Sequence, residues 1–431
     1  MKRTVTSPPS IIGTLTPPGD KSISHRSTIL NAMATGEATV TNYSPGADCA
    51  STIRCLRALG ATIERLEEPG SYLVKGVGAG GFREPAEVLN AGNSGTTMRL
   101  MSGLLAGQPF LSVMTGDSSL RSRPMGRILS PLSLMGAHVH GRDGDERAPL
   151  VIKGGNLHGI PYTLPVASAQ LKSCLVIAGL YAKGETSLHS PAASRDHTEL
   201  MLRMMGAQIL EDGLTVTVRP GNPLSAMDVR VPADISSAAY WLVAGVCHPN
   251  AKVTVTDVGI NPTRTGIIDA LQAMGAKLTI ANRRMEGGEE VGDITAESSE
   301  LRGVEIGGDL IPRLLDEGPI LALAACFARG ATVIKDAAEL RVKESDRIKS
   351  STQELSRFGA DIQERPDGMV IRGKGGLRGA VGQSHGDHRM AMTLGVAGLL
   401  AKGQTEVRNP EIASISYPGF WTDLERLAGS M

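Results

Sequence analysis

The chain has 431 residues, of which 41% are hydrophobic, and its 44 Lys and Arg side chains balance its 44 Asp and Glu side chains. It is long enough for two or three domains with cores of their own, and its zero net charge argues against a nucleic-acid or membrane-surface binder. Five cysteines without a CxxC spacing, and an N-terminal MKRTVTSPPS without an apolar segment, predict a cytoplasmic protein with reduced thiols.

One phrase recurs six times along the chain: an apolar helix rich in small residues, a Gly or another breaker, and an alternating strand. The breaks fall near residues 36, 107, 184, 250, 330 and 403. Five copies continue into an amphipathic helix that a Gly ends before another strand, as in LRALGATIE (56–64), and the sixth ends at LERLAGSM. The period exceeds the roughly 20–50 residues of common solenoids. The sequence therefore predicts two clusters of three compact units, each containing helices and strands.

A polar motif precedes each small-residue helix. The six motifs are GDKSISHR (19–26), LNAGNSGTTMRL (89–100), VASAQLKS (166–173), PADISSAAYW (232–241), IPRLLDEGP (311–319) and GDHRM (386–390). Helix N-termini present N–H donors and positive potential, so several of them pointing into one space would bind anions. Capping alone explains PADISSAAYW. It does not explain the Lys, Arg and His side chains of GDKSISHR and GDHRM, because cations are unfavourable at a helix start without a bound anion.

Further basic side chains stand outside these motifs. Arg121 and Arg123 lie in GDSSLRSRPM, Arg195 lies in SRDHTE, and RVKESDR spans 341–347. Guanidinium groups bind carboxylates and phosphates in bidentate fashion, so these clusters suggest ligands with several negative groups. RVKESDR fits equally well a solvated helix face with i,i+3 and i,i+4 ion pairs.

Four carboxylates lie in these segments: Asp316 and Glu317 in LLDEGP, and Glu344 and Asp346 in RVKESDR. Asp316 stands just before the very apolar ILALAACFA, where a carboxylate is either a helix N-terminal residue or a general base. The chain has no zinc-ligand spacing, no GxxxxGK[ST] loop and no GxSxG elbow. We therefore expect an enzyme or binding protein without a metal or cofactor.

The segments GDKSISHR, GNSGTTMRL, RSRPM, SAQLKS, RVKESDR and GDHRMAM, in this order over nearly the whole chain, closely resemble the motifs of the 5-enolpyruvylshikimate-3-phosphate synthase family, the 3-phosphoshikimate 1-carboxyvinyltransferases. SAQLKS, SRDHTE and RVKESDR are most similar to its class II bacterial form. The resemblance implies an α/β fold of the α+β type, a two-domain inside-out barrel of six βαβαββ repeats, three per domain. It implies one domain at 20–233, a second at 1–19 plus 234–431, and an active site in the interdomain cleft.

The resemblance also implies a reaction in the shikimate pathway of aromatic amino-acid biosynthesis. The enolpyruvyl group of phosphoenolpyruvate moves to the 5-hydroxyl of shikimate 3-phosphate, and phosphate leaves, by addition and elimination through a tetrahedral intermediate. The partners would be these two small molecules, with no cofactor, nucleic acid or membrane, and a monomer is expected.

Site roles follow from the family's motifs at matching positions. The implied ligands of shikimate 3-phosphate are Lys21, Ser22, Arg26, Ser168, Gln170, Arg195, Asp316 and Lys343. The implied ligands of phosphoenolpyruvate are Lys21, Gly95, Arg123, Gln170, Arg347 and Arg389. Asp316 would accept the proton of the 5-hydroxyl, Glu344 would protonate the methylene carbon, and Lys21 would help phosphate leave. His388 is expected beside these groups, and His25 is expected to be structural.

Three positions depart from the pattern of many family members. Ile415 replaces a Lys, Glu339 replaces an Asn, and Ala169 replaces the second of two serines. These departures leave sensitivity to glyphosate, which occupies the phosphoenolpyruvate site in the family, open.

Two alternatives belong to the same fold. UDP-N-acetylglucosamine enolpyruvyl transferase has Lys-Asn where this chain has Lys21-Ser22, and a reactive Cys in a loop whose counterpart here, GDSSLRSRPM, has none. A non-catalytic anion-binding protein would have no need of Asp316 and Glu344 among its basic groups.

Overall fold

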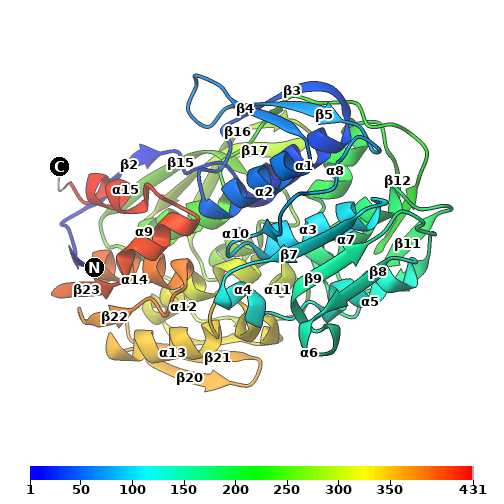
Figure 1. Cartoon of the computed structure of the whole chain (residues 1–431). Helices are drawn as coiled ribbons and strands as arrows, with labels where there is room; N and C mark the ends of the chain where they lie inside the picture. Colours follow the sequence, from blue (N-terminus) through cyan, green and yellow to red (C-terminus); the bar gives the residue numbers. More distant parts are fainter. Residues whose placement is uncertain (430–431) are drawn as a thin grey trace. The chain divides into compact units, whose positions relative to one another are not determined.

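The computed structural model describes residues 1–429, and these form two compact units (Figure 1). Unit 1 comprises Met1–Pro18, Pro232–Met285 and the chain from Glu290 onward, and unit 2 comprises Gly19–Val231 with the short segment Glu286–Glu289. None of the helices within residues 1–429 is long and apolar enough to cross a bilayer.

Unit 2 contains three sheets of four strands, with the orders β14-β3-β5-β4, β6-β7-β9-β8 and β10-β11-β13-β12. In each sheet the first pair is parallel and the other two pairs are antiparallel. The strands are β3 (Thr35–Thr41), β4 (Thr62–Arg65), β5 (Tyr72–Val77), β6 (Leu89–Asn90), β7 (Leu111–Thr115), β8 (His138–Gly141), β9 (Arg147–Lys153), β10 (Pro161–Thr163), β11 (Thr186–His189), β12 (Gln208–Asp212), β13 (Thr215–Arg219) and β14 (Val229–Arg230).

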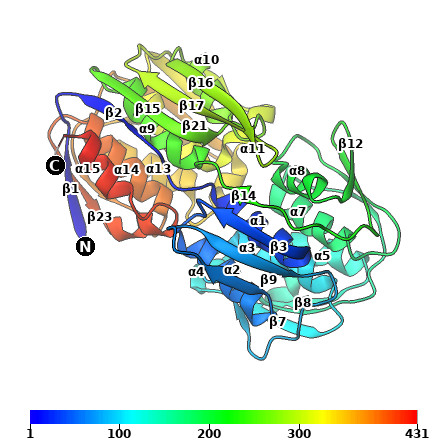
Figure 2. The same cartoon turned by 90° about the horizontal axis from the view of Figure 1, so that it is seen from above.

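Unit 1 repeats this arrangement in the sheets β16-β17-β15-β2 and β18-β19-β21-β20, and a third sheet, β1-β23-β22, has three strands within the described residues. Figure 2 shows β2, β15, β17 and β16 side by side in the first of these sheets. The strands are β1 (Lys2–Thr6), β2 (Ile11–Leu15), β15 (Ala251–Gly259), β16 (Lys277–Glu286), β17 (Glu289–Glu297), β18 (Glu305–Ile306), β19 (Gly330–Ile334), β20 (Asp361–Arg365), β21 (Gly368–Gly373), β22 (Val381–Gln383) and β23 (Gln404–Arg408).

Two strands, β2 and β14, lie where the chain passes from one unit to the other, and each completes a sheet of the unit that precedes the crossing. Strand β2 precedes the first helix of unit 2 but pairs in parallel with β15, and β14 precedes the first long helix of unit 1 but pairs in parallel with β3. Each leading strand therefore stays in the unit that the chain is leaving. The six-fold repeat predicted from the sequence is confirmed as six small sheets with their helices.

The six small-residue helices are buried on nearly all sides, which explains why they lack a polar face. They are α1 (Lys21–Met33), α3 (Gly95–Ala106), α7 (Ala169–Gly179), α9 (Ile235–Cys247), α12 (Gly318–Phe327) and α14 (His388–Leu400). Small residues allow close packing: a Cβ added at Gly103 in α3 would lie 2.2 Å from the carbonyl oxygen of Cys174 in α7. The backbones of α3 and α7 thus lie in direct contact.

The six outer helices are amphipathic, and they cover the buried set. They are α2 (Ala47–Ala58), α5 (Gly126–Leu134), α8 (His197–Met204), α10 (Gly266–Ala273), α13 (Arg347–Arg357) and α15 (Phe420–Leu427). Shorter helical segments include α4 (Ser118–Ser122), α6 (Arg142–Asp145), α11 (Ile311–Leu314) and the turns η1 (Gly308–Leu310), η2 (Leu315–Glu317), η3 (Ala338–Val342) and η4 (Pro410–Ile415).

Candidate active site

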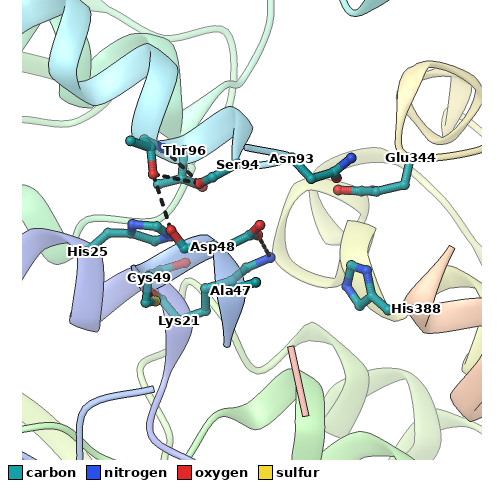
Figure 3. Close-up of polar contacts among 12 residues, drawn as sticks. Lys21, His25, Ala47, Asp48, Cys49, Asn93, Ser94, Thr96, Glu344 and His388 are labelled. Atoms are coloured by element: carbon teal, nitrogen blue, oxygen red, sulfur yellow. Dashed lines mark hydrogen bonds and ion pairs between the residues drawn. The ribbon is translucent and has the colours of Figure 1, made fainter. Parts of the chain in front are cut away.

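In unit 2, the start of α1 combines a helix cap with an ion pair. The Asp20 carboxylate caps the helix by accepting a hydrogen bond from the N–H of Ile23 at 2.9 Å. Lys21, the first residue of α1, places its amine 3.0 Å from a carboxylate oxygen of Asp48 in α2 (Figure 3). Asp48 therefore offsets the cation that the helix N-terminus disfavours. The amine stays partly accessible, because the Lys21 side chain is 17% exposed.

Arg26 lies one turn further along α1 and is almost fully buried. Its guanidinium donates to Thr198 Oγ1 at 2.7 Å, to Ser173 Oγ at 2.8 Å and to the carbonyl oxygen of Ser22 at 3.0 Å. Burial lowers the pKa of Arg26 to about 10, so it is still charged at neutral pH. Arg195 reaches the same place, with Nη1 3.5 Å from Ser22 Oγ. Two guanidinium groups and a serine hydroxyl are thus gathered where the sequence predicts shikimate 3-phosphate.

His25 lies in a buried chain of neutral hydrogen bonds between α1, α2 and α3. Its Nδ1 is 2.7 Å from Thr52 Oγ1, and Thr52 is 2.7 Å from Thr97 Oγ1. Burial lowers the pKa of His25 to about 3, so the ring is neutral throughout the physiological range. The geometry gives His25 the task of joining three helices.

Gln170, near the start of α7, has its side-chain amide fixed by two partners from α3. Arg99 Nη1 donates to Gln170 Oε1 at 2.6 Å, and Gln170 Nε2 donates to Thr96 Oγ1 at 2.9 Å. The neighbouring Ser168 caps α7 by accepting from the N–H of Leu171. Arg99, which was not singled out from the sequence, therefore sets the orientation of a predicted substrate ligand.

Gly95 and Arg123 share a second part of this half-site. Arg123 Nη2 donates to Asn93 Oδ1 at 2.8 Å. A Cβ added at Gly95 would lie 2.9 Å from Arg99 Nη1 and 3.4 Å from Arg123 Nη1. A side chain at this position would therefore displace the Arg99 guanidinium and touch that of Arg123.

Replacing Gly95 by alanine is expected to raise the KM for phosphoenolpyruvate about tenfold, because a displaced guanidinium loses a charge-assisted hydrogen bond of about 1.5–3 kcal/mol. The KM for shikimate 3-phosphate should rise less, through Gln170, which Arg99 orients and which is an implied ligand of both substrates. Steady-state kinetics with each substrate varied in turn measures both. Gly80→Ala is the matched control, since a Cβ at exposed Gly80 would meet nothing within 4 Å. Equal changes in the two KM values would contradict the assignment.

In unit 1, Asp316 is surrounded by cations. Its carboxylate lies within 4 Å of four basic side chains: Arg347 at 3.5 Å, Lys343 at 3.8 Å, Arg389 at 3.8 Å and Arg264 at 3.9 Å. The Asp316 side chain is 18% exposed, so the carboxylate is accessible as well as paired. Such surroundings favour an ionised carboxylate, the state that a proton acceptor needs.

Arg347, the first residue of α13, is the most enclosed of these cations, with a side chain that is 1% exposed. It donates to Asp387 at 2.8 Å through Nε and to Glu344 at 2.6 Å through Nη2. Burial opposes the charge of Arg347, but the nearby Asp387 and Glu344 raise its pKa above the ordinary arginine value. Asp387, also buried, has its pKa lowered because the attraction of Arg347 outweighs its burial. The last residue of RVKESDR, Arg347, therefore belongs to a buried ion network.

In unit 1, Arg264 is a cation that sequence reasoning missed. It is buried, and its Nη2 donates to Ser236 Oγ at 3.0 Å and approaches Asp234 at 3.3 Å. Ser236 in turn donates to the buried carboxylate of Glu317. The repeat could have identified Arg264 from the sequence. It stands just before α10, as Arg123 stands just before α5 and Arg195 just before α8.

Arg389 and His388 adjoin this network. Arg389 is buried near the start of α14, and Asp316 and Tyr240 help to raise its pKa although burial opposes its charge. His388, the first residue of α14, is buried with Nδ1 4.0 Å from Asp387. Ile415 ends η4 and is half-buried.

The two units thus offer different chemistry. Unit 2 supplies five cationic side chains, those of Lys21, Arg26, Arg99, Arg123 and Arg195, which suit phosphate and carboxylate ligands. Unit 1 joins Arg and Lys to Asp316 and Glu344, which suits binding together with proton transfer. We name these sets the unit 2 half-site and the unit 1 half-site.

Comparisons with known proteins agree with this chemistry. The family model described as "EPSP synthase (3-phosphoshikimate 1-carboxyvinyltransferase)" matches residues 5–424. Proteins named 3-phosphoshikimate 1-carboxyvinyltransferase are similar: that of Gloeobacter violaceus is 55% identical over 95% of both chains, and that of Geobacillus thermodenitrificans is 52% identical over 97% of both. A solved EPSP synthase structure from Acinetobacter baumannii is 43% identical, with a TM-score of 0.88 over 99% of this chain and 98% of that one.

This structural similarity confirms the predicted two-domain inside-out fold class. The family match extends over nearly the whole chain, and the relatives exceed half identity over nearly their full lengths. The chain belongs to the EPSP synthase family, the 3-phosphoshikimate 1-carboxyvinyltransferases.

Proposed function

We propose that this protein transfers the enolpyruvyl group of phosphoenolpyruvate to the 5-hydroxyl of shikimate 3-phosphate in the cytoplasm, releasing phosphate. The observation that carries the proposal is Asp316, a partly accessible carboxylate within 4 Å of four cations. Family membership supports the reaction, and the half-sites provide residue types that it requires.

In this proposal the unit 2 half-site binds the anionic groups of the substrates. Arg26, Arg195 and Ser22 hold shikimate 3-phosphate, Arg123 and the backbone at Gly95 hold phosphoenolpyruvate, and Lys21 contacts both. The Lys21 amine neutralises charge that develops on the departing phosphate, a form of electrostatic stabilisation. Its ion pair with Asp48 keeps it charged and oriented before substrates bind.

The unit 1 half-site carries out the proton transfers. Asp316 removes the proton of the 5-hydroxyl as that oxygen attacks C2 of phosphoenolpyruvate, while Glu344 gives a proton to the methylene carbon. These steps form the tetrahedral intermediate, with a methyl group at the former methylene carbon. Return of a methyl proton to the protein and loss of phosphate then restore the double bond. Arg347 and Arg389 hold phosphoenolpyruvate, and Lys343 holds shikimate 3-phosphate.

A phosphate-release assay separates the candidate acceptors. Purified protein is mixed with phosphoenolpyruvate and either shikimate 3-phosphate, UDP-N-acetylglucosamine or no acceptor. Of the three mixtures, only the one that contains shikimate 3-phosphate is expected to release phosphate. Release with UDP-N-acetylglucosamine instead would support the other enolpyruvyl transferase, and no release under any condition would support a binding protein.

Glu344→Gln is expected to lower kcat by about 10²-fold or more, because the amide of glutamine has no acidic proton to give to the methylene carbon. Glutamine keeps an acceptor oxygen for the Arg347 N–H that lies 2.6 Å from Glu344, so the fold should persist. The KM values should change much less than kcat. Steady-state kinetics measures this, and an unchanged kcat would remove Glu344 from the catalytic residues.

A further inference from the structure

Glu289 reaches the unit 2 half-site from an unexpected part of the chain. It begins β17, and the sheet that contains β16 and β17 is otherwise built from segments of unit 1. The turn of this hairpin, Glu286–Glu289, nevertheless belongs to unit 2. A segment far along the chain from α1 and α8 therefore supplies a carboxylate to that half-site.

The partner of Glu289 is His197, the first residue of α8. His197 Nδ1 lies 2.7 Å from Glu289 Oε1, and the two side chains are 2% and 5% exposed. An ionised carboxylate can only accept, so Nδ1 carries the proton and donates it. A buried hydrogen bond to a charged group contributes more than one between neutral groups. The bond holds the first residue of α8 against the β16–β17 hairpin.

The first turn of α8 determines where the shikimate-phosphate ligands lie. Arg195 precedes the turn, with its guanidinium 3.5 Å from Ser22 Oγ. Thr198 accepts from Arg26 Nε at 2.7 Å, and Glu199 pairs with Lys172 of α7 at 2.6 Å. A shift of this turn would therefore move Arg195 and change the support of Arg26.

The charge of Glu289 also acts on this half-site. Burial lowers the pKa of Arg26, whereas the carboxylates of Glu199 and Glu289 partly offset that effect and favour the charged guanidinium. A carboxylate near a phosphate site would by itself weaken phosphate binding. The hydrogen bond of Glu289 is thus expected to strengthen the binding of shikimate 3-phosphate, whereas its negative charge is expected to weaken it. Substitutions that remove one or both can separate the two effects.

We propose that Glu289 is a positioning residue for shikimate 3-phosphate, which it serves by holding His197 and the first turn of α8 so that Arg195 and Arg26 meet the substrate. The inference rests on the proposed function. It adds a residue of the β16–β17 hairpin to the determinants of acceptor binding.

The test compares Glu289→Ala with Glu289→Gln. Alanine removes both the hydrogen bond and the charge, and the KM and Kd for shikimate 3-phosphate are expected to rise about tenfold, the factor that corresponds to about 1.4 kcal/mol. Glutamine keeps an acceptor for the Nδ1–H, so its KM should stay near the wild-type value or fall below it. The KM for phosphoenolpyruvate should stay within about twofold in both variants. Steady-state kinetics and calorimetric titration with shikimate 3-phosphate give these values.

Glu286→Gln is the matched control. Glu286 lies in the same turn but pairs at 2.9 Å with Arg230, whose side chain is 47% exposed. Its loss should leave both KM values unchanged, since exposed ion pairs contribute little. His197→Phe keeps a ring but has no N–H, so it should raise the KM for shikimate 3-phosphate as Glu289→Ala does. The double variant should add little, because the two residues act through one bond.

Three results would overturn the inference. One is a lowered melting temperature in Glu289→Ala with an unchanged KM for shikimate 3-phosphate, which indicates a purely structural bond. A second is a lower KM in both Glu289 variants, which indicates an effect of charge alone. The third is a rise in the KM for shikimate 3-phosphate in Glu286→Gln that equals the rise in Glu289→Ala. If wild-type protein releases no phosphate with shikimate 3-phosphate, the proposed function fails first and this inference falls with it.

Discussion

Replacing Asp316 by asparagine is expected to lower kcat by about 10²–10⁴-fold, the usual contribution of a general base. Asparagine has nearly the same shape but cannot accept the proton of the 5-hydroxyl. The four basic groups within 4 Å of Asp316 would lose one negative neighbour, so they should hold anionic substrates at least as firmly. The KM values should therefore stay the same or fall, which steady-state kinetics would show.

A split between kcat and KM distinguishes a proton acceptor from a binding residue. Asp269→Asn is the matched control, because Asp269 is a 46% exposed carboxylate of unit 1 that pairs with Arg313 at 2.6 Å. Its replacement should change neither constant. A higher KM with an unchanged kcat in Asp316→Asn would contradict the catalytic assignment.

Replacing Arg347 by methionine is expected to destabilise the protein by about 3–5 kcal/mol, the usual cost of removing one partner from a buried ion pair. Asp387 would be left fully buried without the guanidinium that lies 2.8 Å away, and Glu344 would lose its 2.6 Å bond. For a unit of this size the melting temperature should fall by roughly 10 °C. Thermal unfolding followed by circular dichroism measures the change.

The stability that Arg347→Met loses should depend on pH. Arg347 holds the pKa of Asp387 below its ordinary value in the folded protein, so the pair stabilises the fold above about pH 4 and less as the pH falls through the folded pKa. In the variant, buried Asp387 can take up a proton more readily. The difference in melting temperature should thus be largest near neutral pH and smaller near pH 4.

Arg372→Met is the control for the loss of a cation on the surface. Arg372 is 56% exposed and lies 3.7 Å from Asp361, so its removal should cost less than about 1 kcal/mol. A melting temperature of Arg347→Met as high as that of this control would show that the buried network does not stabilise unit 1.

Much of the fold could be predicted from the sequence because each repeat carries its own local signals. Glycine breaks after small-residue helices mark where β3, β11, β19 and β23 begin, and the second helices end at glycines such as Gly60 and Gly275, which have positive φ. The strands β2 and β14 could not be placed in this way, since each pairs with a segment more than a hundred residues away.

The candidate site was predictable where capping failed to explain a residue. Lys21 and Arg389 stood out because helix starts disfavour cations, and each proves to have a carboxylate nearby, Asp48 and Asp316 respectively. Asp48 and Glu289 gave no such signal. An acidic residue at the start of α2 resembles an ordinary helix residue, and Glu289 in a polar hairpin resembles a surface residue until the packing of its turn is known.

The most direct test of the central claim is phosphorus and proton NMR of one reaction mixture containing the protein, phosphoenolpyruvate and shikimate 3-phosphate. Enolpyruvyl transfer predicts one phosphate released for each shikimate 3-phosphate consumed. It also predicts vinyl proton signals of a new enol ether, while the 3-phosphate remains attached. Phosphate and pyruvate formed without consumption of shikimate 3-phosphate would contradict the account.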